Sequence, residues 1–124
     1  MPGTRTAVVI EDDADIGRLI DAVLGLSGVA VRLAATGTGG VEAVRSHSPD
    51  IVILDYGLPD INGLEVIARI RSFSNVHILM LTGREDLSET LMAAGANAVM
   101  TKPFRPRALR TRIEETLGLQ HEQL

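Results

Sequence analysis

The chain has 124 residues, a formal net charge of −4, no cysteine, and only 2% aromatic residues against 45% hydrophobic ones. This length suits one domain with an aliphatic core. The missing thiols exclude disulfides, zinc–thiolate sites and cysteine catalysis. The negative charge argues against nucleic acid as a direct ligand, because phosphate backbones attract basic surfaces.

No apolar run approaches the ~20 residues that a membrane span needs, and the first residues lack the apolar stretch of a signal peptide. We therefore expect a cytoplasmic protein with no membrane partner. The expected single domain covers residues 1–124, with its core at about 5–118, and residues 120–124 are expected to be disordered or the start of a linker.

Apolar runs and helical patterns alternate along the chain. Short aliphatic runs predict buried strands at 7–10, 29–34, 51–54, 78–81 and 96–100. Helical spacing predicts one helix around 16–24, a second around 41–44, and a third that Asn62 and Glu65 begin as a capping box. Asp86 and Glu89 form a second such pattern before a short fourth helix, and Pro106 suits the first turn of a fifth.

Unbroken apolar strands between amphipathic helices indicate a parallel sheet that is covered on both faces. The predicted fold class is α/β, a doubly wound five-stranded parallel sheet of order 2-1-3-4-5, flavodoxin-like, with five helices.

Polar residues follow four of the five predicted strands. They are Glu11, Asp12 and Asp13 after the first, Asp55 after the third, Thr82 after the fourth and Lys102 after the fifth. Taken singly, each has an ordinary structural role, as a helix cap, a turn former or a solvated charge. Taken together, they fall at neighbouring carboxyl ends in the order 2-1-3-4-5, where sites form in such sheets.

This set of residues has a chemical purpose. Clustered carboxylates repel one another and need a cation, and oxygen ligands without Cys or His suit Mg²⁺. An Asp carboxylate can attack a phosphoryl group to give an acyl phosphate. Such a transfer needs mainly positioning and neutralisation of oxygen charge, which the metal, the ammonium of Lys102 and the hydroxyl of Thr82 can supply.

Four segments strongly resemble the receiver domain of two-component response regulators. They are 8–13 (VVIEDD), 55–63 (DYGLPDING), 81–83 (LTG) and 102–104 (KPF), and the resemblance covers about residues 5–118. By this resemblance Asp55 is the phosphoacceptor and a metal ligand, and Thr82 and Lys102 contact the phosphoryl oxygens. The resemblance also implies that Asp12 binds Mg²⁺ directly, Glu11 through water and Gly57 through its backbone carbonyl. It further implies a cis peptide bond between Lys102 and Pro103, whereas Asp13 is left as a charge at the start of a helix.

The resemblance implies a signalling switch. A sensor histidine kinase would supply the phosphoryl group, a change of conformation would control an output domain or partner protein, and the only catalysis would be of the chain's own phosphorylation and slow dephosphorylation. Two features depart from the family pattern: Val99 stands where Tyr or Phe is frequent, and Thr82 and Lys102 are 20 positions apart, a couple fewer than usual. Both lie on the face of the fourth helix, fifth strand and fifth helix, through which relatives form homodimers.

Two alternatives remain open at this stage. The chain could be a degenerate receiver that serves only as an interaction scaffold. It could also be a flavodoxin-like protein that binds FMN or a nucleotide, for which the only support is the glycine-rich stretch 36–40. That stretch lacks the lysine of a P-loop and follows the second strand, so the start of a helix is the favoured interpretation.

Overall fold

The computed structural model describes residues 4–119, and the predicted tail at 120–124 lies outside this range. Strands and helices alternate as the sequence predicts. The strands are β1 (Thr6–Ile10), β2 (Ala30–Ala34), β3 (Ile51–Asp55), β4 (His77–Thr82) and β5 (Ala98–Thr101). The helices are α1 (Ala14–Leu26), α2 (Gly37–His47), α3 (Gly63–Arg71), α4 (Ser88–Ala94) and α5 (Pro106–Leu117), with a short 3₁₀ turn, η1 (Glu85–Leu87), before α4.

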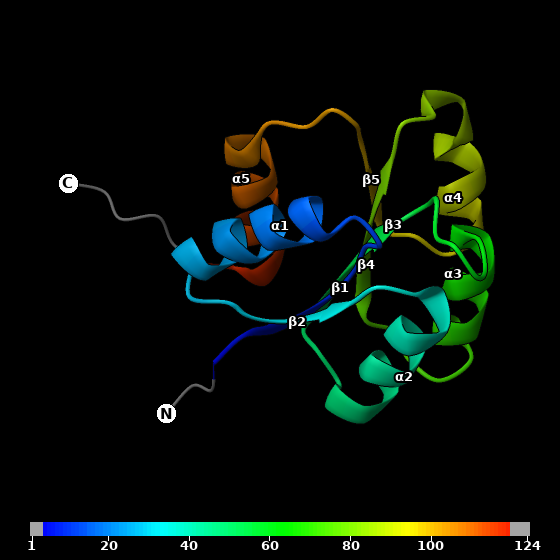
Figure 1. Ribbon diagram of the computed structural model, residues 1–124, viewed down its shortest axis with the longest axis horizontal. Coiled ribbons are helices and arrows are strands. Elements are labelled where there is room, and N and C mark those ends of the chain that lie inside the picture. Colours follow the sequence, from blue (N-terminus) through cyan, green and yellow to red (C-terminus); the bar gives the residue numbers. More distant parts are fainter. Residues whose placement is uncertain (1–3, 120–124) are drawn as a thin grey trace.

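The five strands form one parallel sheet in the order β2-β1-β3-β4-β5, which confirms the predicted topology. Helices α1 and α5 lie on one face of this sheet, and α2, α3 and α4 on the other (Figure 1). Because all the strands are parallel, their carboxyl ends lie together along one side of the sheet, which we call its carboxyl edge.

Aliphatic side chains fill the space on each face of the sheet. Alternate strand residues such as Val9, Ile53 and Leu81 pack towards α1 and α5, while Ile10, Leu54 and Met80 pack towards α2, α3 and α4. All five residues of β3 are buried, because this strand lies in the middle of the sheet with helices on both sides.

Side-chain caps begin three of the helices. Asp13 accepts hydrogen bonds from the backbone N–H groups of Asp15 and Ile16 at the start of α1, and Thr36 caps α2 in the same way through Gly39. The glycine-rich stretch is thus the start of a helix, as favoured. Asn62 caps α3 through the N–H of Glu65, although the side chain of Glu65 pairs with Arg69 instead of completing the capping box.

The fourth helix begins differently from the prediction. The capping box expected at Asp86 and Glu89 is wrong, because the carboxylate of Asp86 accepts from the guanidinium of Arg84 at 2.8 Å and no side chain caps α4. The guanidinium of Arg84 offers the Asp86 carboxylate two charge-assisted hydrogen bonds in place of the single one that a cap would make. The predicted shortness of this helix is correct, since α4 has seven residues.

Strand β5 begins at Ala98 rather than at the predicted position 96. The N–H of Ala96 bonds to the carbonyl of Leu91, which ends α4, before Asn97 joins β4. Within residues 4–119, no helix is long and apolar enough to span a bilayer.

Candidate functional site

The predicted site residues converge at the carboxyl edge of the sheet. Strand pairing sets Ile10 opposite Leu54 and Asp55 opposite Leu81, so Glu11 and Asp55 leave neighbouring strands side by side. Thr82 of β4 pairs with Thr101 of β5, so Lys102, the next residue after Thr101, lies just beyond Thr82 at the same side of the sheet. The exposed fractions of Glu11, Asp55 and Thr82 are only 7%, 6% and 1%. Burying polar residues costs free energy unless they are hydrogen-bonded or paired, so three of them together mark a candidate site.

Lys102 lies among the carboxylates. Its Nζ donates to Asp55 Oδ1 at 2.5 Å and is 3.6 Å from Glu11 Oε1. The bond between Lys102 and Pro103 is cis, as the resemblance implied. Lys102 therefore neutralises part of the acidic charge.

Glu11, Asp12 and Asp55 together can hold a metal ion. One carboxylate oxygen from each lies within 4.8 Å of the others, and the buried Oε1 of Glu11 has no hydrogen-bond partner. The donors are all hard oxygens, which is the set that Mg²⁺ prefers. These observations fit a magnesium ion held by this cluster of carboxylates.

The electrostatics of the site are those of a crowded acidic pocket. Burial raises the pKa of the Glu11 carboxyl above its ordinary value, the N–H of Asp13 opposes this shift, and the charge of Asp55 adds to it. Burial also acts to lower the pKa of Lys102, but its hydrogen bond with Asp55 and the charges of Asp55 and Glu11 outweigh burial and raise that pKa. Lys102 therefore stays charged.

Thr82 and Gly57 border this cluster. The hydroxyl oxygen of Thr82 accepts from the backbone N–H of Arg84 at 3.0 Å, which leaves its hydroxyl proton free to donate to another group. Gly57 lies beside the phosphoacceptor candidate, since a Cβ added at position 57 would be 4.0 Å from Asp55 Oδ2.

One residue of this region was missed from the sequence. The two carboxylate oxygens of Asp60 accept from the backbone N–H groups of Gly37 at 2.8 Å and Thr38 at 2.9 Å. These bonds, that of Thr38 first, hold the pKa of the Asp60 carboxyl well below its ordinary value. Asp60 lies in the recognised 55–63 segment, but a contact across 23 positions leaves no local signal.

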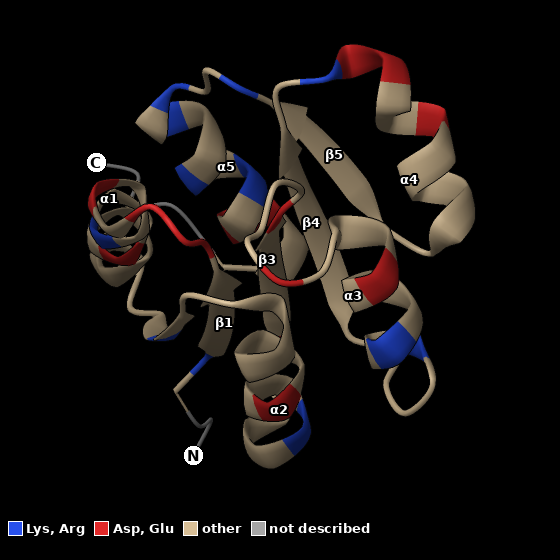
Figure 2. Ribbon diagram, turned by 45° about the vertical axis from the view of Figure 1, so that its right-hand side comes forward, with Lys and Arg blue, Asp and Glu red and all other residues tan. Residues whose placement is uncertain are grey.

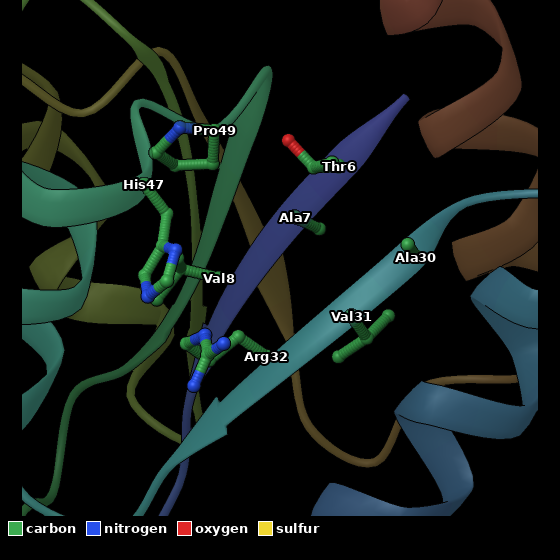
Figure 3. A pocket seen from close by; sticks show the side chains of 8 residues that line it. All are labelled: Thr6, Ala7, Val8, Ala30, Val31, Arg32, His47 and Pro49. Atoms are coloured by element: carbon green, nitrogen blue, oxygen red, sulfur yellow. The ribbon is translucent and has the colours of Figure 1, made fainter. Parts of the chain in front are cut away.

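One hollow of the surface lies away from these residues. It has a volume of about 210 Å³ and is lined by residues of β1, β2 and the end of α2, among them Thr6, Arg32 and His47 (Figure 3). Thr6 is the first residue of β1, whereas Glu11 follows its last. The hollow is therefore at the other end of the strand from the carboxylates, and it contributes nothing to their site.

Charged residues surround the carboxyl ends of the strands. Figure 2 shows acidic residues where the chain passes from β1 to α1 and at the start of α4, and basic residues along α5. The parallel α/β sheet thus carries buried acids, a hydroxyl and a lysine together at the carboxyl ends of its strands.

The response regulator receiver domain family model matches residues 7–114, and the chain belongs to this family. It is 39% identical over 99 residues to the transcriptional regulatory protein KdpE of Mycobacterium tuberculosis, covering 78% of this chain and 44% of that protein. It is 35% identical over 112 residues to the DNA-binding response regulator MtrA of Mycobacterium leprae, covering 89% and 50%. The chain thus spans about half the length of these relatives.

Solved structures agree with this assignment. A CheY-like receiver domain protein from Methanospirillum hungatei superposes with a TM-score of 0.88 at 27% identity, over 94% of this chain and 95% of that one. The beryllofluoride-activated receiver domain of DrrB gives a TM-score of 0.83 at 25% identity, over 94% and 99%.

Proposed function

We propose that this receiver domain stores a phosphoryl group on Asp55, taken from a sensor histidine kinase in the presence of Mg²⁺, and changes conformation to control an output. The observation that carries the proposal is the contact of Lys102 Nζ with Asp55 Oδ1 at 2.5 Å beside the carboxylates of Glu11 and Asp12. It joins a nucleophile, a cation and a metal-binding cluster within one buried edge of the sheet.

The chemistry follows from these groups. An oxygen of Asp55 attacks the phosphorus of a phosphohistidine whose other ring nitrogen carries a proton. The P–O bond forms as the P–N bond breaks, the bonding electrons return to the ring nitrogen, and the histidine leaves as neutral imidazole. Lys102 is already within reach and can share its N–H donors with the incoming oxygens, while Thr82 can donate its hydroxyl proton. A bound Mg²⁺ adds positive charge that offsets the repulsion between the anionic nucleophile and the phosphoryl group. Apart from its own phosphorylation and dephosphorylation, the domain catalyses nothing in this proposal.

The test is intact-mass measurement with acetyl phosphate. Wild type should gain the mass of one HPO₃ group in Mg²⁺ and none after chelation. Asp55→Asn should gain none, and equal labelling of this variant and wild type would refute the role of Asp55. Absence of labelling in wild type, from acetyl phosphate and from phosphorylated kinase alike, would favour the scaffold alternative.

Signal transmission in this proposal depends on Thr82. Its hydroxyl accepts from the N–H of Arg84, and Arg84 immediately precedes η1, whose start no side chain caps. If Thr82 turns towards phosphoryl oxygens, the N–H of Arg84 loses its acceptor and the 83–87 segment is released. Val99 is half-buried against the core and is too small to move with a large change in buried surface.

Comparing NMR shifts of the free and beryllofluoride-bound protein, in which beryllofluoride stands in for the phosphoryl group, tests this route. The shifts should change from Thr82 through α4. Changes confined to the surroundings of Asp55 would show that the output face is static. Sedimentation of the same samples tests the homodimer through α4, β5 and α5, which stays a prediction.

A further inference from the structure

The loop between β3 and α3 carries Gly57, and three sets of contacts fix it. At its base, the N–H groups of Leu58 and Gly63 both bond to the carbonyl of Tyr56, at 3.2 and 3.1 Å. At its far side, both oxygens of Asp60 bond to the amino end of α2. Ile61 packs on the same end, so closely that a Cβ added to Gly37 would be 2.5 Å from Ile61 Cγ1.

Gly57 itself has little to hold it. A Cβ at this position would meet nothing closer than the 4.0 Å contact with Asp55, and the residue is exposed. Because glycine also has the freest backbone of any residue, the conformation at position 57 depends on how the rest of the loop is tied. The tie nearest to it on the α2 side is Asp60, three residues further on.

The Asp60 carboxylate is also well suited to this place. It satisfies two N–H groups of α2 that have no partner within the helix, and its negative charge is favoured at the positive end of the helix dipole. Both of its oxygens are used in these bonds, so Asp60 serves α2 and is not itself part of the Glu11–Asp12–Asp55 cluster.

We propose that Asp60 is a positioning residue for the metal site: by tying the β3–α3 loop to α2 it holds Gly57 in place and so sets the affinity for Mg²⁺. The inference rests on the magnesium site of the proposed function. It adds to that function Asp60, a residue that binds no metal itself but bonds to the amino end of α2. Helix α2 thereby becomes part of the support of the site.

The direct test is a Mg²⁺ titration of the metal-free protein, followed by its tyrosine emission. Tyr56 is the only tyrosine, the chain has no tryptophan, and Tyr56 adjoins Asp55, so its emission reports the site without any need for phosphorylation. The same titration followed by melting temperature is a second readout, because a ligand that binds the folded state raises it.

Asp60→Ala should raise the dissociation constant for Mg²⁺ about tenfold, at the lower end of the ~10–100-fold losses typical of residues that orient metal ligands. Asp60→Asn should lie between this variant and wild type, because its amide oxygen can still accept from one N–H. Gly37→Ala should also weaken binding, since its new methyl group pushes on Ile61 without any change of charge.

Matched controls separate geometry from charge. Asp21→Ala removes an exposed carboxylate of α1, and Gly25→Ala adds a methyl group where nothing lies within 4 Å; both should bind Mg²⁺ as wild type does. If Asp60 acted only through its charge, Asn and Ala would weaken binding equally, Gly37→Ala would have no effect, and the differences would fade in high salt. That result would overturn the inference, as would wild-type affinity in a folded Asp60→Ala.

Phosphorylation gives an independent readout. In Asp60→Ala the Mg²⁺ concentration for half-maximal labelling should rise about tenfold, with the maximal rate at saturating Mg²⁺ retained; a general loss of folding would lower the rate at every concentration. If wild type binds Mg²⁺ but is never phosphorylated, only the proposed function is refuted. The Mg²⁺ affinities of wild type and the Asp60 variants then still test the role of Asp60. Wild type that shows no response to Mg²⁺ in either readout overturns the role of Asp60.

Discussion

Lys102 is the only lysine of the chain, and replacing it by methionine tests whether it stabilises the acidic cluster. Its Nζ is 2.5 Å from Asp55 Oδ1 and 3.6 Å from Glu11 Oε1. At an effective dielectric constant of about 20, these two attractions are of the order of 5–7 kcal/mol each before the loss of hydration is subtracted. Lys102→Met removes both and leaves three carboxylates without a cation.

The net loss is smaller than the sum of the attractions. Removing one partner of a fully buried ion pair costs about 3–5 kcal/mol, and the side chain of Lys102 is 26% exposed, so water screens part of the charge. We expect the free energy of unfolding of the metal-free protein to fall by about 2 kcal/mol, or roughly 8 °C in melting temperature for a domain of this size. Arg84→Met is the matched control, because Arg84 and Asp86 are 62% and 65% exposed and such pairs contribute about 0–1 kcal/mol.

The magnesium response gives this prediction a second part. Lys102 and Mg²⁺ neutralise the same carboxylates, so Mg²⁺ should bind Lys102→Met more tightly and raise its melting temperature by more than that of wild type. Thermal unfolding in chelator and in Mg²⁺, for wild type and both variants, measures the effect. A metal-free Lys102→Met variant as stable as wild type, or an equal Mg²⁺ response in both, would show that Lys102 does not hold the cluster together.

Two further predictions concern stability away from the site. Burial, followed by the charges of two neighbouring arginines, lowers the pKa of His77, so the unfolded chain binds the proton first as pH falls. Stability from this group is therefore present above its ordinary pKa near 6.5 and is lost below it. Between pH 7.5 and 5.5, the free energy of unfolding in urea should fall less for His77→Gln than for wild type or for the control variant His47→Gln. Equal falls in all three proteins would contradict this. In α2, a Cβ on Gly40 would be 2.4 Å from the fully buried Ile10, so Gly40→Ala should destabilise by about 1–3 kcal/mol, whereas Gly25→Ala should be neutral or stabilising by up to about 1 kcal/mol. A stable Gly40→Ala in the same unfolding assay would show that Ile10 can yield.

The order of strands and the edge that carries the site could be predicted because the signals are local. Runs such as Ile51–Leu54 are too apolar for a half-exposed strand and too short for a helix, which indicates strands that are buried on both faces. Because these strands alternate with amphipathic helices, a parallel sheet between two helix layers was the expected topology. In that topology, the residues at or just after the carboxyl ends of neighbouring strands lie close together whatever the details of packing. Glu11, Asp55, Thr82 and Lys102 could therefore be chosen as candidates from their strand-end positions and their chemical types together.

Element starts were harder to predict where two local signals compete. Asp86 and Glu89 have the spacing of a capping box, yet the guanidinium of Arg84 takes the Asp86 carboxylate and the helix begins without a side-chain cap. At β5, the end of α4 occupies the N–H of Ala96. In both places the residue that forms the observed bond, Arg84 or Leu91, lies outside the short sequence pattern on which the prediction was based.

The sequence by itself determined the alternation of elements, the parallel sheet and the set of polar residues at its carboxyl edge, because hydrophobic periodicity and strand-end position are properties of neighbouring residues. Only the tertiary structure decided that Lys102 bonds to Asp55 rather than to solvent, that Asp60 ties its loop to Gly37 and Thr38, and that a Cβ on Gly40 would meet Ile10. These contacts join positions 22 to 47 residues apart, or depend on ångström-scale spacing between packed elements. No periodicity along the chain encodes such distances, because they are set by how helices pack on the sheet.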